Sequence, residues 1–299
     1  MLRLAGSKRV AGIVSRSDIA KRLSLRFVAG DTFDDAVAVV RDLNARGMVA
    51  SLDALGENVG GKGEAAAARD QYLSLLDGIV AAGIKSTISL KLTMLGLDIS
   101  DEICRSNLRP VLERARDLDT FVRIDMEGSG YTRRTLNLFY EHQLEFGDHV
   151  GIVLQSYLYR TDRDVTTAIE KKARVRLVKG AYAEPAAIAY PRKQSVDGAF
   201  RRQMEALLSG GNHLAIATHD AAIIEAAKRY TRQMQIPREQ FEFQMLNGIR
   251  KDLQEQLVRE GYTVRVYVPF GRQWYAYFMR RMAERPANLL FVLRNIVRG

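Results

Sequence analysis

Residues 241–268 read FEFQMLNGIRKDLQEQLVREGYTVRVYV, in which two β-rich runs flank a stretch of helical length. The runs are Phe241–Met245 and Val264–Val268, and the amphipathic stretch between them is Ile249–Glu260. Parallel strands cannot be joined by a tight turn and need a crossover of about a dozen residues or more, which is usually a helix. This part of the chain therefore predicts one repeat of a parallel α/β fold.

The same alternation recurs along most of the chain. The other six predicted strands are Val49–Leu52, Ser86–Leu92, Thr120–Ile124, Val150–Leu154, Val175–Val178 and Leu214–Ala217. Further helices are predicted at Glu64–Ala82, Asp101–Arg116, Thr132–Phe146, Arg192–Leu208 and Ala221–Met234. Eight such units favour a closed (β/α)8 TIM-type barrel. A doubly wound sheet is the alternative, although no G-x-G-x-x-G turn follows the first strand.

The segments outside the repeats predict additional helices at both ends of the barrel. We expect an N-terminal helical segment over residues 1–46, and the barrel with a C-terminal helix over residues 47–299. Helical stretches near Trp274–Ala283 and Leu289–Val297 follow the last predicted strand. No Ser/Gly/Pro-rich linker divides the chain, so residues 1–299 are expected to form a single domain.

The composition is that of a water-soluble globular protein, with 47% hydrophobic and 27% charged residues among 299. No apolar run approaches the ~20 residues that span a bilayer. Cys104 is the single cysteine, which rules out an intrachain disulfide and fits a reducing, cytoplasmic location. The four histidines lack the spacing of metal ligands, so no metal is expected.

The net charge of +10 predicts an anionic partner, and part of this charge is local. Residues 1–26 carry seven basic residues against the single acid Asp18. This stretch is typical of a solvated terminal helix, of a helix that lies on a membrane surface, or of a transit peptide. The sequence alone does not decide among these three alternatives. It shows no signal-peptide pattern.

Polar residues stand at the end of every predicted strand. They are Asp53, Lys91, Asp125, Gln155, Lys179, His219, Gln244 and Tyr267. In a barrel the carboxyl ends of the strands meet at one mouth, where the βα loops place catalytic side chains. An isolated polar residue would merely cap a loop, but a ring of eight predicts a ligand site at the mouth.

Arg280 and Arg281 follow the last strand in a segment that is rich in aromatic residues. Glu284 lies four residues after Arg280 and can form an ion pair with it on a helix. The simpler interpretation is a solvated basic face. The nearby Trp274, Tyr275, Tyr277 and Phe278 favour an apolar pocket with an anion clamp instead.

Taken together, nine segments in order resemble the proline dehydrogenase family, both its monofunctional bacterial enzymes and the matching domain of bifunctional proline-utilisation proteins. The segments are 26–30 (RFVAG), 55–57 (LGE), 89–93 (SLKLT), 123–127 (RIDME), 154–158 (LQSYL), 176–182 (RLVKGAY), 217–220 (ATHD), 242–246 (EFQML) and 280–284 (RRMAE). The length leaves no room for an aldehyde dehydrogenase half, so the monofunctional type is expected.

The resemblance implies noncovalently bound FAD over the mouth of the barrel. The residues that it places around the flavin are Gln155, Arg176, Val178, Lys179, Gly180, Ala181, Tyr182, Arg192, Lys193, Thr218, His219 and Gln244. Pro191 stands where the family more often has threonine, which weakens the transfer for the two residues after it. For the substrate, the resemblance implies a carboxylate clamp of Lys91, Arg280 and Arg281 supported by Asp125, with walls formed by Leu246, Tyr267 and Tyr277.

The implied reaction is the oxidation of L-proline to Δ1-pyrroline-5-carboxylate, the first step of proline catabolism. A hydride would pass from substrate C5 to flavin N5, and electrons would then pass to a quinone in the membrane. The implied partners are this quinone, the inner face of the cell membrane, and a pyrroline-5-carboxylate dehydrogenase.

Two other classes of function remain to be compared with a flavoenzyme. A Schiff-base lyase or aldolase could use Lys91 or Lys179, because barrels often place a reactive lysine at a strand end. A basic protein that binds nucleic acid or membrane would fit the charge, but it leaves the ring of polar strand ends unexplained. No nucleic-acid-binding motif occurs in the sequence, so no nucleic-acid partner is expected.

Overall fold

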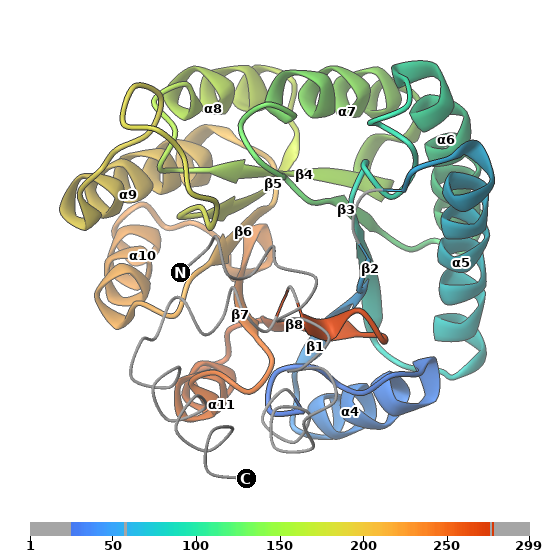
Figure 1. Ribbon diagram of the computed structural model, residues 1–299. Coiled ribbons are helices and arrows are strands. Elements are labelled where there is room, and N and C mark those ends of the chain that lie inside the picture. The colour runs from blue at the N-terminus through green and yellow to red at the C-terminus, as the bar shows by residue number, and fades with distance from the viewer. Residues whose placement is uncertain (1–24, 57–58, 276, 278–299) are drawn as a thin grey trace, which may run out of the picture.

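The computed structural model describes residues 25–56, 59–275 and 277, and eight parallel strands form a closed barrel within them (Figure 1). The strands are β1 (Val49–Ala54), β2 (Ser86–Leu90), β3 (Val122–Ile124), β4 (Val150–Gln155), β5 (Arg174–Val178), β6 (Leu214–Ala217), β7 (Phe241–Leu246) and β8 (Val264–Phe270). Each strand pairs with the next, and the β1–β8 pair closes the circle through Ala50 and Val266. The barrel prediction is confirmed, and the doubly wound sheet is excluded.

Helices connect successive strands and surround the barrel (Figure 1). They are α5 (Lys62–Ala81), α6 (Asp101–Asp117), α7 (Thr132–Phe146), α8 (Thr161–Glu170), α9 (Lys193–Gly210), α10 (Ala221–Gln233) and α11 (Lys251–Arg259). Side-chain caps fix some of the starts: Ser100 accepts from the backbone of Ile103 in α6, and Asp220 accepts from that of Ala222 in α10. Within the described part of the chain, no helix is long and apolar enough to cross a membrane.

Helix α4 (Phe33–Ala45) precedes the barrel and closes its outer layer. A capping box between Thr32 and Asp35 starts the helix, and its apolar face includes Val37 and Val40. The helix packs against β1 and β8, where the eighth helix of a regular barrel would lie (Figure 1). Residues 1–24 of the predicted basic segment 1–26 lie outside the described residues. So do residues 276 and 278–283 of the predicted helix Trp274–Ala283 and all of the predicted helix Leu289–Val297.

The apolar core lies between the strands and the helices, whereas the interior of the barrel is polar. Inward-facing and outward-facing residues alternate along each strand. On β5, for example, Val175 and Leu177 face the helical shell, and Arg176 reaches across the barrel to Ser89 on β2. Most barrels fill their interior with branched apolar side chains. This interior therefore carries charges that packing alone does not require.

Three of these charges form what we call the floor layer, Arg123, Glu242 and Arg265. The Nε of Arg265 lies 2.8 Å from Oε1 of Glu242. Arg123 is 2% exposed and donates to the carbonyl oxygens of Ile152 and Arg174 at 3.0 and 2.7 Å. Its guanidinium has room because residue 151 is glycine, where a Cβ would lie 2.5 Å from Nη1 of Arg123.

His213, which directly precedes β6, makes the fold sensitive to acid. Burial lowers the pKa of His213 to about 4, with Glu242 opposing this effect and Arg174 adding to it. The unfolded chain binds this proton near the ordinary histidine pKa of ~6.5, so protons favour unfolding between these values. We expect the free energy of unfolding to fall by up to about 3 kcal/mol as the pH drops from 6.5 to 4.

Urea denaturation at pH 7 and pH 4.5 measures this effect, with His213→Gln as the comparison. The variant should lose less stability between the two pH values than the parent protein loses. An equal loss in both proteins would show that other groups cause the acid sensitivity.

Candidate active site

A cavity of about 570 Å³ opens at the carboxyl ends of the strands. All eight polar residues predicted at the strand ends line it, from Asp53 on β1 to Tyr267 on β8. The cavity falls within the ~300–1,000 Å³ that small-molecule sites usually have. The barrel thus brings together side chains that are separated by more than two hundred positions in the sequence.

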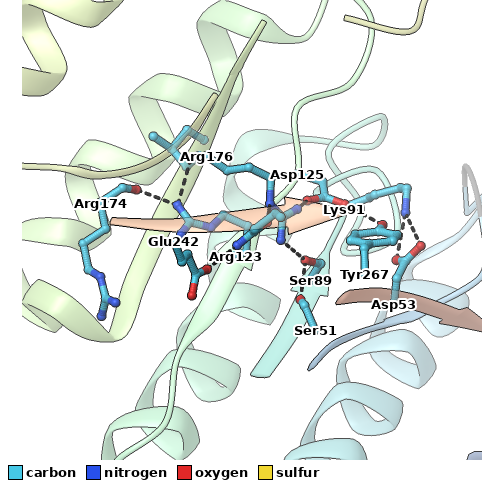
Figure 2. A network of polar contacts seen from close by, with 12 residues as sticks. Ser51, Asp53, Ser89, Lys91, Arg123, Asp125, Arg174, Arg176, Glu242 and Tyr267 are labelled. Carbon is cyan, nitrogen blue, oxygen red and sulfur yellow. Dashed lines mark hydrogen bonds and ion pairs between the residues drawn. The ribbon is translucent and has the colours of Figure 1, made fainter. Parts of the chain in front are cut away.

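A buried ion pair occupies one side of the cavity. The Nζ of Lys91 donates to Oδ1 and Oδ2 of Asp53 at 2.9 and 3.1 Å, and both residues are buried (Figure 2). Burial by itself would lower the pKa of Lys91, but the carboxylates of Asp53 and Asp125 outweigh it and raise this pKa. Burial raises the pKa of Asp53, and Lys91 acts against that shift. Lys91 is therefore a charged ammonium group at neutral pH.

Asp125 connects Arg176 and Tyr267 at the centre of the cavity. Its Oδ1 accepts from Nη1 of Arg176 at 2.7 Å, and its Oδ2 accepts from the hydroxyl of Tyr267 at 2.8 Å (Figure 2). The guanidinium of Arg176 also donates to Ser89 at 3.1 Å and to Oε1 of Gln244. Burial, and then the charge of Asp125, raise the pKa of Tyr267 well above its ordinary value. These contacts hold the phenol and the guanidinium in fixed positions before any ligand binds.

Two lysines and two aspartates form a charged cluster at the rim. The Nζ of Lys179 lies 2.6 Å from Asp197 and 2.9 Å from Asp220, and Lys193 contacts the same two carboxylates. Burial acts to raise the pKa of each aspartate, but the ammonium groups outweigh it and lower both pKa values. The cluster is formally neutral, so an anionic group such as a phosphate can bind here only by sharing the two ammonium groups with the aspartates.

The loop between β5 and α9 is fixed across the mouth. Gly180 has a φ of +113°, and a Cβ there would lie 2.2 Å from the ring of Tyr157. The carboxylate of Glu184 accepts from the backbone and the hydroxyl of Ser129 at 2.7 and 2.6 Å. The backbone of Tyr190 donates to Tyr157 at 2.8 Å. The loop is therefore tied to both the β3–α7 and the β4–α8 loops.

The chemistry of the lining fits a large ligand with an apolar surface and polar edges. Gln155 lines the cavity, and its Oε1 is buried without a hydrogen-bond partner among the described residues. A buried amide oxygen of this kind calls for a donor, which a bound ligand can supply. Nε2 of His219 accepts from the backbone of Leu246 at 2.9 Å and so ties the ends of β6 and β7 together. A flavin ring with its polar edge meets these requirements.

Most of the residues predicted for the site meet in this cavity. They are Lys91, Asp125, Leu246, Tyr267 and Tyr277 from the predicted substrate site, and Gln155, Arg176, Val178, Lys179, Gly180, Ala181, Tyr182, Lys193, Thr218, His219 and Gln244 from the predicted cofactor site. Arg192 is exposed at the start of α9 and does not line the cavity. Arg280 and Arg281 lie outside the described residues.

Two acids of the site have no individual role in the sequence-based prediction. Asp53 belongs to the predicted ring of polar strand ends without a role of its own, and Asp220, next to His219, is not among the predicted site residues. A usable signal existed for Asp53, because a lysine at the end of an apolar strand needs a carboxylate partner when it is buried. The remaining lining residues that were missed are apolar: Met126, Val153, Ala217 and Met245.

The closed barrel carries ion pairs and amide side chains around a cavity at its mouth. This arrangement is that of an α/β-barrel enzyme. The family model described as proline dehydrogenase matches residues 36–294, and the chain belongs to this family. It is accordingly an oxidoreductase of the first step of proline catabolism. This membership decides against the aldolase alternative.

Known relatives cover most of the chain. Proline dehydrogenase 1 of Bacillus subtilis is 44% identical over 91% of this chain and 90% of the relative. Proline dehydrogenase of Deinococcus radiodurans is 42% identical over 93% of this chain and 91% of the relative. The solved proline utilization A of Bdellovibrio bacteriovorus, inactivated by N-propargylglycine, superimposes with a TM-score of 0.83 at 27% identity. That match covers 88% of this chain and 32% of the longer protein.

Proposed function

We propose that the chain binds FAD noncovalently at the mouth of its barrel and oxidises L-proline to Δ1-pyrroline-5-carboxylate. The observation that carries this proposal is the cavity at the strand ends, with the Lys91–Asp53 ion pair on one side and the unsatisfied amide oxygen of Gln155 in its lining. When bound, the flavin would accept at N5 the hydride that leaves C5 of the substrate. The protein's own task is to bind and orient the two reactants.

Residues at the carboxyl ends of β4, β5, β6 and β7 and in the segments that follow these strands would hold the cofactor. Those that line the cavity are Gln155, Arg176, Val178, Lys179, Gly180, Ala181, Tyr182, Lys193, Thr218, His219 and Gln244. Lys179 and Lys193 at the rim suit an anionic diphosphate, and Gly180 allows a ligand to approach the backbone. Arg192, at the start of α9, would reach the cofactor from outside the described cavity.

The substrate would lie beside Lys91. A carboxylate is bound best by arginine forks together with a lysine, and Arg280 and Arg281 would supply the forks. Asp125 would act through Arg176 and Tyr267, whose positions it fixes. Tyr267, Tyr277 and Leu246 would enclose the ring of proline with apolar surface.

Electrons would leave the flavin for a membrane quinone. The net charge of +10 supports peripheral contact with anionic lipid on the inner face of the cell membrane. The product would pass to a pyrroline-5-carboxylate dehydrogenase, with which contact is part of the proposal. A single domain over residues 1–299 would perform the whole reaction.

The visible spectrum of the purified protein tests the proposal directly. We expect a yellow protein whose flavin band bleaches when L-proline is added without oxygen. Alanine, which has the same carboxylate but no ring, should leave the band unchanged. A protein that binds no FAD contradicts the cofactor, and a flavin band that persists with proline contradicts the substrate.

A further inference from the structure

The floor layer lies directly beneath the residues of the cavity. Arg123, Glu242 and Arg265, on β3, β7 and β8, stand two positions before Asp125, Gln244 and Tyr267, which line the cavity. Because side chains alternate along a strand, each faces inward one level below a cavity residue. Figure 2 shows Arg123 and Glu242 of this layer together with Asp125 and Tyr267. None of the three lines the cavity itself. They are too deep to bind substrate or cofactor, and the proposed function gives them no part.

The floor layer carries an excess of positive charge. Arg265 is paired with Glu242, whereas Arg123 donates to two backbone carbonyls and has no carboxylate partner in the described part of the chain. Burial, followed by repulsion from Arg176 and Arg174, lowers the pKa of Arg123 well below its ordinary value. Arginine nonetheless stays protonated in proteins. Two guanidinium groups therefore face one carboxylate.

Glu242 is ionised and is hydrogen-bonded to a residue that lines the cavity. Burial would raise the pKa of Glu242, but the charge and hydrogen bond of Arg265 outweigh it and lower the pKa to about 2. Its carboxylate also accepts from the amide nitrogen of Gln244, and Oε1 of Gln244 in turn accepts from Arg176. A chain of polar contacts thus joins the floor layer to two residues that line the cavity.

A purely structural role does not account for these charges. Apolar side chains of similar volume fill most barrels, and replacing buried charges by such residues is often neutral or stabilising. Inside a protein, however, charges are weakly screened and act over several ångströms on a neighbouring site. A charged floor beneath a redox site changes the free energy of any charge that forms above it.

We propose that the floor layer sets the reduction potential of the flavin bound above it, with Arg123 raising this potential and Glu242 lowering it. The proposal rests on the proposed function. Reduction adds negative charge to a flavin, so a buried positive charge below it favours the reduced form and a buried negative charge disfavours it. The two residues should therefore act with opposite signs from almost the same depth in the barrel.

Redox titration of the bound FAD in the Arg123→Met and Glu242→Gln variants tests this proposal. We expect the midpoint potential to fall in the first variant and to rise in the second, each by about 30 mV or more. For a two-electron couple, 30 mV is a tenfold change in the equilibrium between oxidised and reduced forms. Arg229→Met, which removes a charge from the exposed face of α10, should leave the potential unchanged.

Charge-conserving variants keep the test decisive where a substitution perturbs folding. Arg123→Lys and Glu242→Asp retain the charge but change the shape, and we expect their potentials to stay close to that of the parent protein. Parent-like potentials in Arg123→Met and Glu242→Gln, or shifts in one direction for both, would overturn the proposal. A parent protein without flavin would instead overturn the proposed function.

Discussion

Replacing Lys91 by methionine is expected to lower kcat/KM for proline by about 10²- to 10³-fold and to destabilise the fold by about 3–5 kcal/mol. Both effects follow from the ion pair with Asp53, which lies 2.9 Å from the ammonium group and is 1% exposed. Methionine matches the length of lysine but leaves the carboxylate buried without a partner. It also removes the cation that we propose to bind the substrate carboxylate. Steady-state kinetics and urea denaturation measure the two effects separately.

The double variant Lys91→Met/Asp53→Asn separates binding from stability. Neutralising Asp53 removes the unpaired charge, so much of the lost stability should return while kcat/KM stays low. Recovery of activity in the double variant would show that Lys91 serves only to neutralise Asp53. Proline kinetics like those of the parent protein in Lys91→Met itself would remove this lysine from the substrate site.

Replacing Gly180 by alanine is expected to weaken FAD binding by about 10- to 100-fold, which corresponds to about 1.4–3 kcal/mol. The φ of +113° strains any residue with a side chain, and the new Cβ would lie 2.2 Å from the ring of Tyr157. The β5–α9 loop must move to relieve this contact, and the loop lines the cavity from Lys179 to Tyr182. Fluorescence titration of the apoprotein with FAD measures the affinity.

Gly130→Ala provides the matched control for this substitution. Gly130 also lies in a βα loop, between β3 and α7, but a Cβ there meets nothing within 4 Å. Its variant should bind FAD like the parent protein. Equal affinities in the Gly180 and Gly130 variants would mean that the loop can move without disturbing the cofactor site.

Much of the barrel could be predicted because apolar residues recur with different periods in strands and in helices. The predicted strand Leu214–Ala217 and the predicted helix Thr132–Phe146 agree with β6 and α7 at both ends. The boundaries differ where glycines are frequent: the predicted helix Glu64–Ala82 corresponds to α5, which already begins at Lys62. The glycine before it provides the extended N-cap, which explains how a glycine-rich stretch can open a helix.

The residues at the mouth of the barrel could be predicted better than those of the floor layer. The carboxyl ends of parallel strands always meet, so topology alone brings Asp53 and Lys91 to the same cavity. Arg123, Glu242 and Arg265 lie inside the predicted strands Thr120–Ile124, Phe241–Met245 and Val264–Val268, not at their ends. Their alternation with apolar neighbours, as in Phe241–Gln244, was the available signal. Strands covered on both faces are usually apolar throughout, so a polar residue at every second position indicates a charged interior.

The pairing of β1 with β8, which closes the barrel, also affects how this chain can fold during its synthesis. These strands pair through residues such as Ala50 and Val266, and α4 rests on both of them. Helix α4 and β1 leave the ribosome before their shared partner β8, which begins only at Val264. Loop closure over such a separation is slow. Until β8 emerges, one edge of β1 and the part of α4 that packs on β8 therefore stay uncovered and accessible to chaperones.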